Sequence, residues 1–120
     1  MTLMNKRRVG ADKEALAEAY LKKRGVKIVC KNYRVRQGEI DLIGWEKNTL
    51  LFIEVKYRKN NKAGSALEAV GYAKKKQISR VSLFYLNQKR LGMNISMRYD
   101  VVAIDGEVIT WVKNAFSYCG

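Results

Sequence analysis

The distribution of apolar and polar residues along the chain predicts five strands and two helices. Segments in which the two kinds alternate, with β-branched and aromatic residues among them, predict strands over residues 27–36, 39–45, 49–57, 98–104 and 108–112. Two stretches of helix-forming composition predict helices over residues 11–24 and 65–90. This order of helix, three strands, helix and two strands predicts an α/β domain with a mixed sheet flanked by helices.

Turn and capping signals delimit several of these elements. Lys47-Asn48 is expected to form a two-residue turn between the second and third strands, and Asp105-Gly106 is a strong hairpin signal. Ser65, with Glu68 three residues later, forms a capping-box pattern at the start of the second helix. The two turns determine which residues face each other across the predicted strands.

Acidic residues interrupt the apolar faces of two neighbouring predicted strands. With Lys47-Asn48 as the turn, Asp41 lies opposite Glu54, and Glu39 lies opposite Lys56. Two carboxylates about 5 Å apart repel by roughly 3 kcal/mol at an effective dielectric constant of about 20. A divalent cation between Asp41 and Glu54 would compensate this repulsion, and oxygen ligands suit Mg²⁺, for which Mn²⁺ can substitute. Lys56 could position a water or stabilise charge on a phosphate, so these four residues are the candidate catalytic groups.

The same acids also admit a structural interpretation. A solvated strand face carrying a Glu39–Lys56 ion pair would show a similar pattern. Against this, Ile43 and Phe52 share the face with the acids, which predicts that the face is mostly buried. Glu14 lies on the apolar stripe of the first predicted helix, where it could complete the acidic cluster or serve as a first-turn acid favoured by the helix dipole.

Composition adds a strong excess of positive charge. The chain has 24 Lys and Arg against 11 Asp and Glu, a formal charge of +13, which indicates a nucleic acid or an anionic membrane surface as partner. Neither predicted helix pairs a broad apolar face with a basic one, which disfavours the membrane. The absence of histidine excludes Ser-His-Asp and His-metal chemistry. The candidate phosphate-binding residues are Arg34, Arg36, Arg58, Lys59 and Lys74.

Length and cysteine content indicate a single intracellular domain. The 120 residues are expected to form one domain over residues 10–120, preceded by a basic, flexible N-terminus over residues 1–9. Two cysteines are too few for a disulfide scaffold, and no apolar run is long enough for a membrane span. We therefore expect a cytoplasmic location.

The acid pattern resembles that of a known nuclease superfamily. Asp41 followed by Glu54-Val55-Lys56 is similar to the PD-(D/E)xK motif. With the residues around it, the chain resembles the YraN family of small bacterial proteins, which is similar to archaeal Holliday junction resolvases. The residues that carry this resemblance are Asn32-Tyr33-Arg34, residues 38–43, residues 52–58, Glu68-Ala69-Val70, residues 99–102 and Asn114-Ala115-Phe116.

The resemblance implies a restriction-endonuclease-like fold and Mg²⁺-dependent cleavage of a nucleic-acid phosphodiester, with DNA, branched or structured, as the expected substrate. By the same resemblance, Asp41, Glu54 and the backbone carbonyl of Val55 would hold the metal. Lys56 would orient or activate the attacking water, and Glu14 would match a helix acid of the resolvases. A homodimer, in which two sites address two strands, is the assembly that the resolvases suggest.

Two alternatives from other classes remain open on the sequence. One is a non-catalytic nucleic-acid-binding module that keeps the fold, and it predicts salt-sensitive binding that substitution of Asp41 or Glu54 leaves unchanged. The other is a role on structured RNA, which the charge alone favours. Tyr33, Trp45 and Tyr57 are expected in the core or against the sheet, so no base-stacking platform is predicted.

Overall fold

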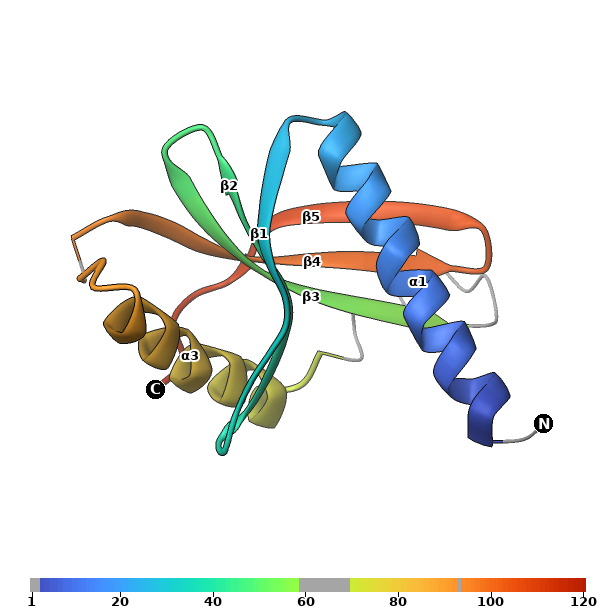
Figure 1. Cartoon of the computed structure of the whole chain (residues 1–120), viewed down its shortest axis with the longest axis horizontal. Coiled ribbons are helices and arrows are strands. Elements are labelled where there is room, and N and C mark those ends of the chain that lie inside the picture. Colours follow the sequence, from blue (N-terminus) through green and yellow to red (C-terminus); the bar gives the residue numbers. More distant parts are fainter. Residues whose placement is uncertain (1–2, 59–69, 93) are drawn as a thin grey trace.

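One five-stranded sheet forms the centre of the protein (Figure 1). A computed structural model describes residues 3–58, 70–92 and 94–120, and for residues 3–11 it describes the backbone alone. The helices are α1 (Leu3–Lys23) and α3 (Tyr72–Gln88). The strands, in their order across the sheet, are β1 (Val26–Val35), β2 (Gly38–Glu46), β3 (Thr49–Arg58), β4 (Ser96–Asp105) and β5 (Val108–Phe116).

The sheet is mixed. β3 and β4 run parallel, and the other neighbouring strands run antiparallel. Parallel neighbours need a crossover connection, and α3 lies in the segment that joins β3 to β4. The predicted order and the restriction-endonuclease-like α/β arrangement are therefore confirmed.

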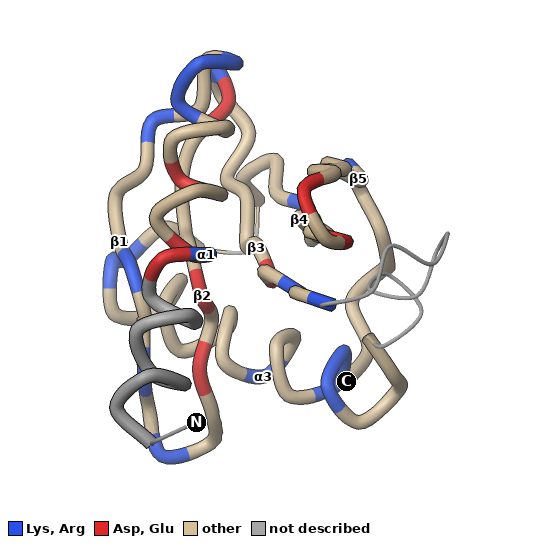
Figure 2. Tube along the Cα trace, turned by 90° about the vertical axis from the view of Figure 1, so that its right-hand side faces the viewer, with Lys and Arg blue, Asp and Glu red and all other residues tan. Residues whose placement is uncertain are grey.

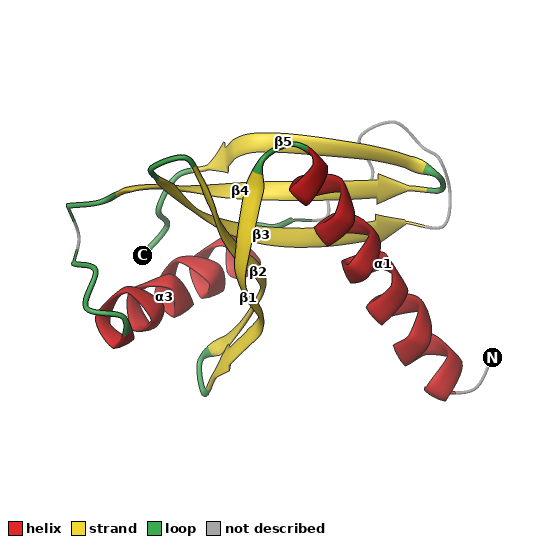
Figure 3. Cartoon of the chain, turned by 45° about the horizontal axis from the view of Figure 1, so that its top comes forward, coloured by secondary structure: helices red, strands yellow, loops and turns green. Residues whose placement is uncertain are grey.

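α1 and α3 cover opposite faces of the sheet (Figure 3). Alternate residues of β3 show this division, because Leu51 and Ile53 pack in a core with Leu21 of α1, whereas Leu50 and Phe52 pack in a second core with α3. The residues that α3 contributes to the second core are Ile78, Val81, Tyr85 and Leu86. Burial on both faces holds β3 at the centre of the molecule.

The predicted register between β2 and β3 is confirmed. Glu46 pairs with Thr49 across the Lys47-Asn48 turn, and Leu42 pairs with Ile53. The turn prediction for the last two strands was off by one residue, because Asp105 itself pairs with Val108. The loop is therefore residues 106–107, in which Gly106 adopts a φ of 62° that glycine tolerates without strain.

Both helices begin elsewhere than predicted. The backbone of α1 is already helical at Leu3, ahead of the expected start at residue 11. α3 begins at Tyr72, because Gly71 at its N-cap is extended and Val70 is also outside the helix. The proposed capping box of Ser65 and Glu68 lies outside the described residues. Within the described chain, no helix is long and apolar enough to cross a membrane.

Candidate active site

The acidic residues lie where β2 separates from β3. β2 pairs with β1 along its full length, but with β3 only from Leu42 to Glu46. Asp41 is thus the first residue beyond that pairing, and its Oδ2 accepts a 2.8 Å hydrogen bond from the backbone N–H of Val55. The Asp41 carboxylate therefore accepts the hydrogen bond of a β3 backbone N–H that has no partner on β2 at this point.

This separation also interrupts the alternation of side chains along β2. Ile40 and Ile43 both pack in the core beneath α3, whereas Leu42 packs in the core beneath α1. Strict alternation would place Ile40 and Leu42 on one face, so the strand twists sharply around Asp41. Figure 2 shows the result, with acidic positions of α1, β2 and β3 gathered in the middle of the molecule.

Glu54 is the most unusual acid of the group. It is only 3% exposed, and its Oε2 lies 3.7 Å from Lys56 Nζ and 3.6 Å from Lys74 Nζ. Its Oε1 is buried and has no hydrogen-bond partner among the described residues. Burial, then the negative charge of Asp41 and a hydrogen bond to that carboxyl group, raise the pKa of Glu54 to about 8 against the opposing effect of the two lysines. The predicted proximity of Asp41 and Glu54 is thus present in the structure.

Glu14 approaches the same acids from α1. Burial raises its pKa, the charges of Asp41 and Glu39 raise it further, and a hydrogen bond from Asn32 partly offsets these effects. Of the two roles that the sequence left open, the geometry places Glu14 beside the acidic cluster.

Glu39 is paired differently from the prediction, because Arg34 Nε donates to Glu39 Oε2 at 2.9 Å. The Glu39–Lys56 ion pair of the structural interpretation is not among the described ion pairs, since Lys56 turns to Glu54.

The candidate phosphate-binding residues divide into two groups. Lys74 leans into the acid site, whereas Arg36 and Arg58 are exposed. Arg34 is exposed but engaged by Glu39, and Lys59 lies outside the described residues. The sequence signal for its inward position is the spacing within α3, because Ile78 and Val81 follow Lys74 at i+4 and i+7 and both pack in the core.

The donor set at this site suits an oxygen-seeking cation. No group of three acidic or cysteine side chains in the described ranges is close enough to hold a metal ion. Two carboxylates are present, however, and the unpartnered Glu54 Oε1 is an acceptor that a cation would satisfy. Asp41 and Glu54 could therefore hold Mg²⁺ together with water, and the family resemblance implies the carbonyl of Val55 as a third ligand.

A second charged group, which was not predicted from the sequence, lies on β4 and β5. Asp100 is fully buried and accepts hydrogen bonds from Arg98 Nε at 2.9 Å, Trp111 Nε1 at 2.9 Å and the backbone N–H of Asn114 at 2.8 Å. Arg98 also donates to Glu46 Oε1 at 2.8 Å. Because both oxygens of Asp100 have donors, this group is structural, and its sequence signal is an acid inside an apolar strand.

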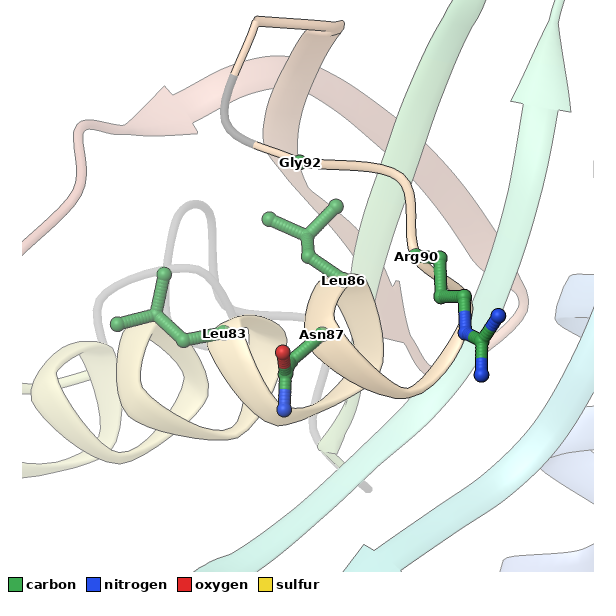
Figure 4. A pocket seen from close by; sticks show the side chains of 5 residues that line it. All are labelled: Leu83, Leu86, Asn87, Arg90 and Gly92. Carbon is green, nitrogen blue, oxygen red and sulfur yellow. The ribbon is translucent and has the colours of Figure 1, made fainter.

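A pocket of about 570 Å³ lies away from the acids, at the C-terminal end of α3 (Figure 4). Its lining residues are Leu83, Leu86, Asn87, Arg90 and Gly92. None of these side chains is acidic or nucleophilic, so the pocket lacks the groups that hydrolytic chemistry requires.

The mixed sheet, with acids at the point where β2 leaves β3, defines a restriction-endonuclease-like α/β protein. The family model described as "Uncharacterised protein family UPF0102" matches residues 13–104, and the chain belongs to this family. The resemblance to the YraN family is thereby confirmed.

Relatives from several bacteria match between 86% and 98% of the chain. UPF0102 protein VP0448 of Vibrio parahaemolyticus is 42% identical over 119 residues, which cover 98% of both chains. A UPF0102 protein of Lachnoclostridium phytofermentans is 41% identical over 98% of this chain and 99% of its own. One from Legionella pneumophila is 44% identical over 86% of this chain and 89% of its own. These names state the family and no activity.

Proposed function

We propose that this protein is a Mg²⁺-dependent endonuclease that hydrolyses phosphodiester bonds in DNA, with branched or structured DNA as its substrate. The observation that carries the proposal is the buried carboxylate of Glu54, which lies beside Asp41 and has one oxygen without a donor in the described chain. With a pKa of about 8, this group is protonated at neutral pH without a cation, because its buried charged form is costly unless something compensates that charge. A bound cation would provide that compensation.

The residues of the site have separate tasks in this proposal. Asp41, Glu54 and the Val55 carbonyl would hold the cation, which supplies Lewis-acid polarisation of the phosphate and a lowered pKa of a bound water. Hydrolysis joins the water oxygen to phosphorus and breaks the ester P–O bond, and a proton passes to the leaving oxygen. Lys56 has three donors and no acceptor while it is charged, so it would hold a phosphate or water oxygen rather than accept a proton.

Lys74 would add a second positive charge to the same place. Its Nζ lies 3.6 Å from Glu54 Oε2, and the side chain is about one-third exposed, so a phosphate could reach it from solvent. Preorganised cations of this kind stabilise the charge that develops on a phosphate during hydrolysis. We therefore treat Lys56 and Lys74 as phosphate-orienting groups.

Metal titration and cleavage assays on the same samples test the proposal. Mn²⁺ would be titrated by calorimetry into the wild type and into an Asp41→Asn/Glu54→Gln double variant, in which the introduced asparagine amide oxygen can still accept the Val55 hydrogen bond. We expect the double variant to lose both metal binding and cleavage of labelled junction DNA. Glu107→Gln, which changes an exposed acid in the β4–β5 turn, is the matched control and should retain both. Cleavage by the double variant at the wild-type rate would refute the proposal.

A non-catalytic nucleic-acid-binding module is the second candidate function, and one observation favours it. Lys56 and Lys74 both neutralise Glu54 Oε2, so the acid already has two cationic partners in the protein itself. In that case the double variant would bind duplex DNA, junction DNA or structured RNA as tightly as the wild type, and no substrate would be cleaved. Competition among these three nucleic acids would then identify the bound class.

We also propose that the protein acts as a homodimer, because two strands of a branched DNA need two sites. Sedimentation velocity at the assay concentration should give twice the monomer mass. A monomer mass in the presence of junction DNA and Mg²⁺ would contradict this assembly without affecting the acid site.

A further inference from the structure

A polar pocket lies where the turn between β1 and β2 meets the N-terminal end of α3. Figure 1 shows the tip of this hairpin near the beginning of the helix, and Gly38 beside the turn lies against Gln77 of α3. The pocket has a volume of about 390 Å³. Its lining residues are Gln37 from the turn and Tyr72, Ala73, Lys76, Gln77 and Arg80 from α3.

An exposed aromatic ring and cationic side chains line this pocket. Tyr72 is 66% exposed, although tyrosine rings are more often partly buried. Lys76 and Arg80 have no acidic partner among the described residues, in contrast to Arg98 and Lys113, which both pair with Glu46. α3 itself contains four cations and no acid, so the pocket is positively charged.

Gln77 connects the pocket to the acid site through Lys74. Gln77 Oε1 accepts a 3.2 Å hydrogen bond from Lys74 Nζ, and the same ammonium lies 3.6 Å from Glu54 Oε2. The turn is packed tightly on this glutamine, because a Cβ added at Gly38 would overlap with the Gln77 side chain. One lysine therefore joins the wall of the pocket to the proposed metal ligand.

We propose that this pocket binds one unpaired nucleotide of a DNA substrate. The base would stack on Tyr72, the backbone phosphate would contact Lys76 and Arg80, and the amides of Gln37 and Gln77 would bond to the base edge. The volume lies within the range of small-ligand pockets, which is roughly 300–1,000 Å³. In a paired duplex both faces of each base are covered by neighbours, so an exposed ring and a concave pocket favour an unpaired base. This inference rests on the proposed nuclease function and names its substrate class as DNA with an unpaired nucleotide near the cleaved bond.

Fluorescence anisotropy in EDTA tests the pocket without any cleavage. The probes are a labelled duplex and the same duplex with a short single-stranded gap. The wild type should prefer the gapped probe, and Tyr72→Ala should weaken binding of that probe by roughly 5- to 150-fold, the equivalent of about 1–3 kcal/mol per stacked base. Tyr72→Phe keeps the ring and should retain the preference. Arg80→Ala should weaken binding of the gapped probe and reduce its salt dependence.

The controls use the same residue types outside the pocket. Tyr118→Ala removes another exposed tyrosine, and Arg90→Ala removes an arginine just beyond the C-terminal end of α3. Neither should change the preference for the gapped probe. Equal losses in Tyr72→Ala and Tyr118→Ala, or a wild type without any preference, would overturn the proposal.

The two proposals fail in distinguishable ways. The Asp41→Asn/Glu54→Gln variant should keep its preference for the gapped probe even if it cleaves nothing, because no metal is present in the binding assay. A preference for gapped DNA without cleavage in Mg²⁺ would support the pocket and count against the nuclease. Cleavage without that preference would overturn the pocket alone.

Discussion

At the scale of single residues, Glu54 determines how the site responds to pH. Its pKa is about 8 in the folded protein, against an ordinary value of 4.5, because burial and the charge of Asp41 both disfavour the carboxylate. Between these two values the folded chain binds more protons at this position than the unfolded chain. Without metal, the free energy of unfolding must therefore fall as pH rises from 4.5 to about 8.

Glu54→Gln removes this titration and gives the first prediction. In EDTA the variant should become progressively more stable than the wild type as pH rises, by at most about 1.4 kcal/mol per pH unit. Below pH 4.5 the stability difference between variant and wild type does not change with pH, because Glu54 is protonated in both the folded and the unfolded state. Above about pH 8 this stability difference becomes constant again. Thermal unfolding of both proteins across this pH range measures the difference.

Glu107→Gln is the control for this experiment, since it changes an exposed acid in a turn. Its stability relative to the wild type should stay nearly constant over the same pH range. If Glu54→Gln and wild type instead lose stability in parallel, Glu54 is not held protonated by its surroundings. Added Mg²⁺ should stabilise the wild type at pH 8 but not Glu54→Gln, because only the ionised carboxylate binds the cation.

At the scale of elements, hydrogen bonds to Asp100 hold the edge strand β5 against β4. The pairing of β4 with β5 shifts between Tyr99 and Val101, and Asn114 adopts a φ of 55° in the opposing strand. The Asp100 carboxylate accepts the Asn114 N–H that this irregularity frees, and it also accepts the Trp111 N–H. A buried acid thus supplies hydrogen bonds that the strand ladder does not.

Asp100→Ala should therefore be strongly destabilising. It leaves the part-buried donors of Arg98 and Trp111 without their acceptor, and loss of one partner of a buried charged pair costs up to about 3–5 kcal/mol. Urea unfolding measures this loss. Glu46→Gln, which changes the more exposed acid that contacts the same arginine, should cost much less. A loss below about 1 kcal/mol for Asp100→Ala would show that β5 does not depend on this carboxylate.

The same elements show what the sequence could and could not predict. The Asp41–Glu54 proximity was predictable because a two-residue turn and strand alternation together determine the register. The pairing of Glu39 with Arg34 was not, because it depends on β2 leaving β3 beyond Leu42, and alternation carries no information on where pairing ends. The Asp100 hydrogen bonds likewise require a strand irregularity that appears only when β4 and β5 are packed.

At the scale of the whole molecule, the net charge is +13, but we expect only some of the lysines and arginines to contact DNA. Several of these cations already contact other side chains in the folded protein. Lys113 pairs with Glu46, and Arg24 lies 3.5 Å over the Tyr20 ring. Arg58, by contrast, is exposed at the end of β3, two residues beyond Lys56 on the strand that carries the acid site.

Arg58→Ala should therefore change the salt dependence of DNA binding, whereas Arg24→Ala should not. Each phosphate that a cation neutralises contributes about 0.9 to the slope of log K against log salt concentration for duplex DNA. The slope of Arg58→Ala should be shallower than that of the wild type by about this amount, with Arg24→Ala as the matched arginine control. Anisotropy titrations at several salt concentrations measure the three slopes. If both variants change the slope equally, the positive charge acts as a diffuse field over the whole surface, and DNA is not held at the face that carries Glu54.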